Sequence, residues 1–206
     1  MSRASTGNSS ELQLPAPDLG GPLQRLIIQR RSHRSFKKGE LAPSQLALIL
    51  WSAQGCVDGS RRAVPSAGAT YPLDVLVALN QPGVPGFAAG VYRYLPARNA
   101  LLLEQPGKLL HHISEACYDQ GFIAMVPAVL VITCELSRIA RRYGDRSHRY
   151  IYMEAGHSGQ NVHLVTESLG LGTVMVGAFN DAELTKVLRL PNGHEPVYVL
   201  PIGTPA

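Results

Sequence analysis

The chain has 206 residues, of which 45% are hydrophobic and 17% charged, and its formal net charge is +4. This length and composition indicate one globular domain rather than a disordered chain. The basic residues fall into three groups instead of lining one face, so nucleic-acid binding is not predicted. The longest apolar run is far shorter than the ~20 residues of a membrane helix, no secretory signal is recognisable, and three cysteines do not suggest a disulfide framework, so we expect a cytoplasmic protein.

The chain is predicted to consist of a flexible N-terminal arm, residues 1–21, and a single domain, residues 22–206. The arm is rich in serine, glycine and proline and has little hydrophobic pattern. The domain begins with a short helix over 22–30, which ends at a group of arginines.

The next predicted helix covers 42–55, with Ser44 as its N-cap and apolar residues recurring on one face. A turn-rich segment then leads to a strand over 73–80. A hairpin follows, with strands over 90–95 and 100–104.

The second half of the chain begins with a predicted helix over 106–118. An apolar strand over 127–135 follows and is expected to be covered on both faces. The longest helical pattern covers 150–169 and contains Gly156 and Gly159. One face of it is expected to form a buried stripe, at spacings of three and four: Ile151, Ala155, Ser158, Val162, Val165 and Leu169. Each glycine costs about 1 kcal/mol in a helix interior, so we expect close approach of another backbone, of a ligand or of a second subunit.

The last predicted elements are a short strand over 172–179, a helix over 181–190 with Asp181 as N-cap, and a strand over 196–203. Hairpin strands, separate strands and helices together predict an α+β fold in which helices pack on a mixed sheet.

The basic segment "RRSHRSF" at 30–36 is the first candidate binding site. The planar fork of an arginine matches phosphate oxygens, and Ser32 adds a hydroxyl donor. A helical turn would place Arg30 and Arg34 on one side. A solvated basic turn remains the alternative for this segment taken alone.

Two further loops carry small residues, "PSAGATYP" at 65–72 and "MVGAFND" at 175–181. Loops of this kind expose backbone amides and let a flat ligand approach closely. Ordinary turns remain the alternative for both. Glu154 lies three residues before His157, a spacing seen in metal pairs, but no second such pair exists, so no metal site is predicted.

These three segments, in this order and spacing, resemble the nitroreductase-like FMN flavoprotein family. The segment "RRYGDRSHRYIYMEAGHSGQNVHLVTESLGLG" at 141–172 is similar to the SagB-type dehydrogenase branch, which includes thiazole- and oxazole-forming oxidases. The resemblance covers residues 23–203. It implies a mixed, mainly antiparallel sheet flanked by helices, and an intertwined homodimer with FMN at its interface.

The resemblance also implies the residues that bind FMN. Four residues of the basic segment would hold the phosphate, ribityl chain and pyrimidine edge: Arg30, Arg31, Ser32 and Arg34. Five residues of the partner subunit would line the isoalloxazine: Pro65, Ser66, Ala67, Gly68 and Ala69. Gly177 and Ala178 would lie near the reactive N5 edge, and the helix 150–169 would belong to the dimer core.

This chain departs from the family pattern at three places. Ala69 stands where many nitroreductases carry an asparagine. A basic C-terminal tail is missing, and Arg146 or Arg149 is the expected substitute. The Lys-Tyr pair of azoline oxidases is matched by Arg142 and Tyr143, and an arginine cannot act as a base because it stays protonated. Tyr143 or a water would then take that role, Arg142 would bind an anionic substrate group, or Arg142 would be an exposed residue of a basic helix end.

The resemblance therefore implies an FMN-dependent oxidoreductase that passes a hydride between flavin N5 and a small molecule or a modified peptide. One alternative is a nitro or quinone reductase with NAD(P)H as a transient reductant. Another is a flavin-binding subunit, without catalysis of its own, of a multi-enzyme peptide-modifying complex.

Overall fold

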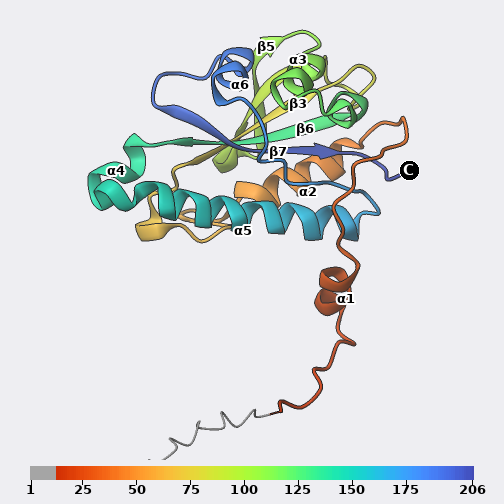
Figure 1. Ribbon diagram of the computed structural model, residues 1–206, viewed down its shortest axis with the longest axis vertical. Helices are drawn as coiled ribbons and strands as arrows, with labels where there is room; N and C mark the ends of the chain where they lie inside the picture. Colours follow the sequence, from red (N-terminus) through yellow and green to blue (C-terminus); the bar gives the residue numbers. More distant parts are fainter. Residues whose placement is uncertain (1–12) are drawn as a thin grey trace, which may run out of the picture.

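The computed structural model describes residues 13–206, so most of the predicted arm 1–21 lies outside the described residues. Its centre is a five-stranded sheet in the order β5-β4-β3-β6-β7 (Figure 1). Every neighbouring pair of strands is antiparallel. The strands are β3 (Leu73–Leu79), β4 (Gly90–Leu95), β5 (Ala100–Pro106), β6 (Ala128–Glu135) and β7 (His194–Ile202).

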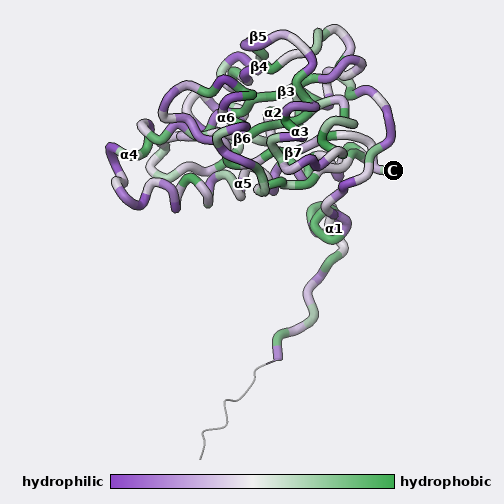
Figure 2. The backbone as a smooth tube through the Cα atoms, turned by 45° about the horizontal axis from the view of Figure 1, so that its top comes forward, coloured by the Kyte–Doolittle hydropathy of each residue, from purple (hydrophilic) through white to green (hydrophobic). Residues whose placement is uncertain are grey.

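Helices cover both faces of this sheet (Figure 1). One face packs against α2 (Pro43–Gln54) and α5 (Ser147–Ser168), and the other against α3 (Leu110–Ala116) and α6 (Asp181–Leu188). Because successive side chains of a strand point to opposite faces, β6 supplies both cores and is buried along almost its whole length. Its neighbour β3 is also strongly hydrophobic (Figure 2). The predicted α+β fold is confirmed.

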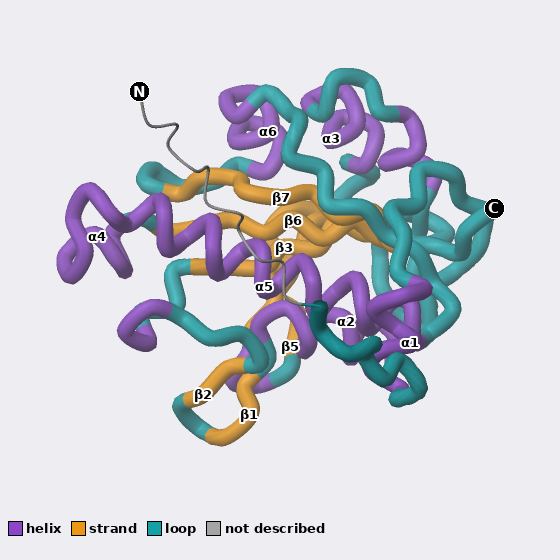
Figure 3. Tube along the Cα trace, turned by 60° about the horizontal axis from the view of Figure 1, so that its bottom comes forward, coloured by secondary structure: helices purple, strands orange, loops and turns teal. Residues whose placement is uncertain are grey.

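The remaining elements lie around this three-layer body (Figure 3). They are α1 (Pro22–Gln29), α4 (Ser137–Tyr143), the small hairpin of β1 (Cys56–Asp58) and β2 (Arg61–Arg62), and the 3₁₀ turns η1 (Ala67–Ala69), η2 (Pro96–Arg98), η3 (Gly121–Met125) and η4 (Gly144–Arg146). Helix α1 has no buried residue. Among the described residues, no helix is long and apolar enough to cross a membrane.

Two helix starts differ from the prediction by one or two residues. The N-cap of α2 is Ala42 rather than Ser44, because Pro43 needs no partner for an N–H at the first position and Gln45 Oε1 accepts from the Ala42 N–H at 3.0 Å. The N-cap of α6 is Asn180 rather than Asp181, and Asn180 Oδ1 accepts from the Glu183 N–H at 3.1 Å.

Two other predicted elements were partly wrong. Helix α3 begins at Leu110 instead of 106, because Pro106 is the last residue of β5 and Gly107 turns the chain at φ 113°. The predicted strand 172–179 forms only isolated bridges. Thr173 pairs with Ser32, Gly172 pairs with the residue that follows β7, and Val176 pairs with Val199 within β7.

The long helix α5 buries the predicted stripe, with Ile151, Ala155 and Val162 inside. Its two glycines have different surroundings. A Cβ at Gly159 would overlap the sulfur of Met175, whereas a Cβ at Gly156 would meet nothing within 4 Å. The predicted close approach therefore holds within the chain for Gly159 alone, and a side chain rather than a backbone makes it.

Candidate functional site

The basic segment 30–36 is extended and fixed along its length. The His33 N–H donates to the Thr173 carbonyl at 3.0 Å, and Ser32 forms a parallel bridge with Thr173. Helix α1 ends with Arg30 as its C-cap, so Arg30 and Arg34 do not share a helical turn and that part of the prediction was wrong. The segment is nevertheless an ordered edge and not a free turn.

This edge is positively charged and open to an anion. Arg31, Ser32 and Arg34 are exposed and Arg30 is half-buried. Within residues 13–206 none of the three arginines forms an ion pair. Below it His163 is 2% exposed, and burial, followed by the charges of Arg30 and His33, lowers its pKa to about 4. The histidine is neutral near pH 7, so the arginines carry the positive charge.

Gly177 and Ala178 lie along the same segment as the basic edge. They are exposed and come four and five residues after Thr173, which in an extended chain is about 13–16 Å. A bridge between Val176 and Val199 fixes their position. Gly177 opens onto a cavity of about 220 Å³, which Tyr152 and Tyr198 also line.

The turn 65–69 is held by the residues predicted to be catalytic. Gly68 and Ala69 have φ of 57° and 53°, a region that favours glycine. Arg142 Nη1 donates to the Gly68 carbonyl at 3.0 Å, and a Cβ at Gly68 would come within 2.8 Å of the Tyr143 hydroxyl. The structure therefore brings Arg142 and Tyr143 onto the turn that contains Pro65, Ser66 and Ala67.

Behind this turn lies a buried polar network that the sequence did not reveal. Gln54 Nε2 donates to Glu154 Oε1 at 3.3 Å, and Arg62 Nη1 donates to Gln54 Oε1 at 3.2 Å. The Arg62 guanidinium also lies 4.6 Å from the centre of the Tyr71 ring. Burial raises the pKa of Glu154. Polar residues in a helical pattern usually indicate a solvated face, so no sequence signal marked these positions as buried.

Glu154 and His157 do not act as a pair, because Glu154 is buried against Gln54 whereas His157 is exposed. A different cluster does bring possible metal-ligand atoms together, since those of Asp74, Glu135 and His194 lie within 4.8 Å of one another. Arg138 binds both carboxylates of this group, with one contact of 2.9 Å to Asp74. We interpret the group as an ion-pair network at the ends of the neighbouring strands β3, β6 and β7.

In one chain the candidate site is divided by α5. Tyr152 lines the cavity at Gly177, whereas Glu154 faces Gln54 behind the turn 65–69. Tyr152 and Glu154 are two positions apart on the helix, which rotates their side chains by about 200° relative to each other. They therefore point to nearly opposite sides. The basic edge and Gly177 form one half of the site, and the turn with Arg142 and Tyr143 forms the other.

The comparisons with known proteins identify the family of the chain. A model of the family described as "Nitroreductase family" matches residues 27–204. The chain belongs to the nitroreductase family. It is therefore an oxidoreductase.

Three relatives define its place in the nitroreductase family. A Methanocaldococcus jannaschii protein named as a nitroreductase is 41% identical over 199 residues, which is 96% of this chain and 98% of that protein. The microcin B17-processing protein McbC of Escherichia coli is 28% identical over 63% of this chain and 49% of its own. A crystal structure of a Ralstonia eutropha protein, also named as a nitroreductase, has a TM-score of 0.78 and 31% identity, and the match covers 94% of this chain and 88% of that one.

Proposed function

We propose that this nitroreductase-family protein is a homodimeric FMN-dependent oxidoreductase of the SagB type, which passes a hydride between flavin N5 and a small molecule or a modified peptide. The observation that carries the proposal is the basic edge joined to Gly177 by a fixed extended segment. One end of this segment offers arginines that form no ion pair among residues 13–206, and the other offers an exposed glycine beside a cavity.

The residues present fit FMN. The phosphate would be held by Arg30, Arg31, Ser32 and Arg34, because one guanidinium group can bind two phosphate oxygens at once. The exposed Gly177 and Ala178 would leave room for the ring, since neither residue has a side chain larger than a methyl group. In an extended chain these two residues would lie about 13–16 Å from Thr173, a length that suits an elongated phosphorylated ligand.

A second copy of the chain would complete the site. The turn 65–69 and Gly177 lie on opposite sides of α5 within one chain, so a single chain offers only half of the contacts to each flavin. Large apolar side chains are also exposed on this side of the molecule. They are Leu23, Ile27 and Ile28 on α1, Leu48 and Trp51 on α2, and Tyr152 and Met153 on α5. Exposed apolar residues spread over three helices are typical of a protein interface.

The chemistry would be supplied by the bound FMN, which accepts or donates a hydride, while the chain's residues position the reactants. Arg142 would hold the turn 65–69 through the Gly68 carbonyl, which favours a positioning role over the binding of a substrate anion. Tyr143 would be the group that donates or accepts a proton next to the turn. Its ring is fixed against Tyr150, with 4.7 Å between the ring centres.

Two substrate classes remain within this proposal. The similarity to McbC favours a peptide heterocycle, and in that case the chain would work with other proteins in a complex. The 41% identity to a protein named as a nitroreductase favours NAD(P)H-dependent reduction of a nitro compound or a quinone. Rapid mixing of the flavin-loaded protein with NADH and NADPH separates them. Bleaching of the flavin band within seconds would support the reductase, and no bleaching would support the SagB-type dehydrogenase.

Mixed dimers test whether two chains build each site. One variant carries Arg30→Gln and Arg34→Gln, and the other carries Gly68→Val, which is strained at φ 57° and overlaps Arg142. Each variant alone should lose FMN. A dimer purified with one copy of each should bind about one FMN, because the intact edge of one chain meets the intact turn of the other. A mixed dimer without FMN would contradict the shared site.

A further inference from the structure

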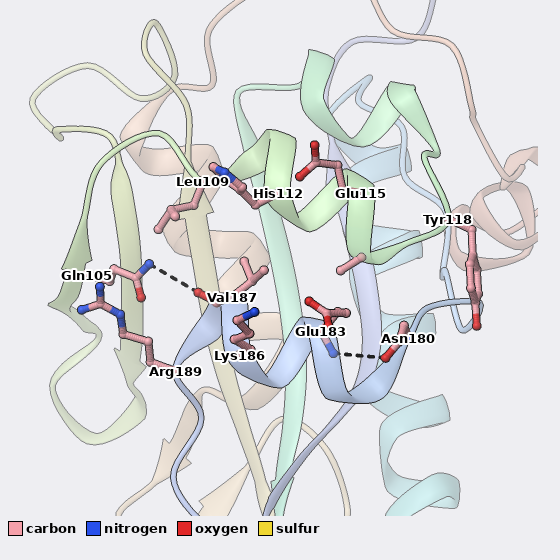
Figure 4. Close-up of a pocket in the computed structure, with 11 residues that line it drawn as sticks. Gln105, Leu109, His112, Glu115, Tyr118, Asn180, Glu183, Lys186, Val187 and Arg189 are labelled. Carbon is pink, nitrogen blue, oxygen red and sulfur yellow. Dashed lines mark hydrogen bonds between the residues drawn. The ribbon is translucent and has the colours of Figure 1, made fainter.

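A second cavity lies on the other side of the sheet from α5, between α3 and α6 (Figure 4). Its volume is about 520 Å³, which is in the range of small-molecule sites. Neither the basic edge nor the turn 65–69 contributes to its lining. The cavity is therefore separate from the proposed flavin site and does not depend on it.

Gln105 on β5 provides the observation that points to a ligand. The residue is 7% exposed, and its Nε2 donates to the Val187 carbonyl at 3.3 Å. Its Oε1 is buried and has no hydrogen-bond partner among residues 13–206. The amide cannot be turned over, because its oxygen would then face the Val187 carbonyl. A buried acceptor without a donor is destabilising, so a ligand N–H or O–H at this point would satisfy a group that the chain leaves unpaired.

The charges around the cavity restrict the ligand further. Figure 4 shows Arg189 beside Gln105 at one end, with Lys186 next along α6, and Glu115 and Glu183 farther from that end. Neither Arg189 nor Lys186 forms an ion pair within the described part of the chain. An anionic group therefore fits the end that contains the unpaired oxygen. The neighbouring walls are apolar, since Leu109 and Val187 line them.

We propose that this cavity binds a carboxylate with an amide N–H on the adjacent carbon, as in an N-acylated amino acid or the C-terminal residue of a peptide. The carboxylate pairs with Arg189 and Lys186. The amide N–H donates to Gln105 Oε1, and an apolar side chain lies against Leu109 and Val187. The buried acceptor lies beside two cations that form no ion pair among residues 13–206. One ligand therefore needs both an N–H donor and a carboxylate.

N-acetyl-L-leucine is the probe, titrated into the full-length protein as purified and followed by calorimetry and by NMR of the probe. Two analogues each lack one feature: N-acetyl-L-leucinamide lacks the carboxylate, and N-acetyl-N-methyl-L-leucine lacks the N–H. We expect saturable binding of the probe and at least about tenfold weaker binding of each analogue, the loss typical of a missing hydrogen bond to a charged or buried group. The tripeptide Ala-Ala-Leu distinguishes the sources: tighter binding than the probe indicates a peptide terminus, and equal or weaker binding indicates a free N-acylated amino acid.

Variants of the cavity must alter the selectivity and not only the stability. Gln105→Leu should abolish the preference for the N–H over the N-methyl analogue. Arg189→Gln should reduce the preference for the carboxylate over the amide, because Lys186 is still present. Arg98→Gln, an exposed arginine of η2, is the matched control and should leave both preferences unchanged. The Arg30→Gln, Arg34→Gln variant should bind the probe as the wild type does, whatever its FMN content. No saturable binding up to ~10 mM probe, or equal binding of all three compounds to the wild type, would overturn the proposal.

Discussion

His163 gives the pH dependence of stability a specific source below the basic edge. In the folded chain its pKa is lowered from 6.5 to about 4, by burial first and then by the charges of Arg30 and His33. Between these two values the unfolded chain binds a proton that the folded chain does not, so the free energy of unfolding falls as the pH falls from 6.5 to about 4. Replacement by glutamine removes this titration.

The magnitude follows from the two pKa values. At ~1.36 kcal/mol per unit, the full shift corresponds to about 3 kcal/mol, of which about 2 kcal/mol is lost by pH 5. The side chain is 2% exposed, so solvent screening reduces this value little. The free energy of unfolding of the wild type should therefore fall by about 2 kcal/mol more than that of His163→Gln when the pH is lowered from 7 to 5.

Urea unfolding of the wild type and of His163→Gln at pH 7 and pH 5 measures how the difference in their free energies of unfolding changes with pH. His157→Gln is the matched control on the same helix, because His157 is exposed. An equal pH dependence for the wild type and His163→Gln would refute the reasoning, since it would mean that His163 titrates alike in the folded and unfolded chains.

Three further predictions concern the framework of the site. Gly159→Ala should lower the free energy of unfolding by about 1–3 kcal/mol through overlap with Met175, whereas Gly156→Ala should not; equal effects in urea unfolding would show that Met175 moves aside without cost. Arg142→Gln should weaken FMN binding about 3- to 30-fold by releasing the Gly68 carbonyl, whereas Arg141→Gln should not. Equal FMN affinities of the two variants in a fluorescence titration would contradict this role of Arg142. Iodoacetamide should label Cys56 alone in the native protein, since Cys117 and Cys134 are buried and burial raises the pKa of each thiol to about 12; mass spectrometry of a chain labelled at all three would contradict this.

Much of the fold was predictable because local patterns and the final packing agree. The apolar run of β6 and the stripe of Ile151, Ala155 and Val162 on α5 indicated buried elements, and both are buried. The start of α6 was missed by one residue because Asn180 and Asp181 are both good caps, and only the backbone geometry decides between them. The segment 172–179 was taken for a strand because its composition is apolar, whereas its pairing is divided between Ser32 and β7.

Motifs suggest the residues of the candidate site, but they do not predict how these residues are arranged. The contact of Arg142 with Gly68 joins residues 74 positions apart, and no local pattern encodes such a distance. The burial of Glu154 with Gln54 was equally hidden, because a glutamate in a helical pattern normally faces solvent. The cavity at Gln105 was missed for the same reason: its lining comes from β5, α3 and α6, which are separated in the sequence.

The FMN content of the purified protein tests the central claim most directly. The account predicts a yellow protein with about one FMN per chain, measured from the flavin absorbance after release and from the protein concentration. The Arg30→Gln, Arg34→Gln variant should retain its fold but lose most of this FMN, because it lacks two guanidinium groups of the basic edge. A colourless wild-type protein that takes up no added FMN would contradict the account.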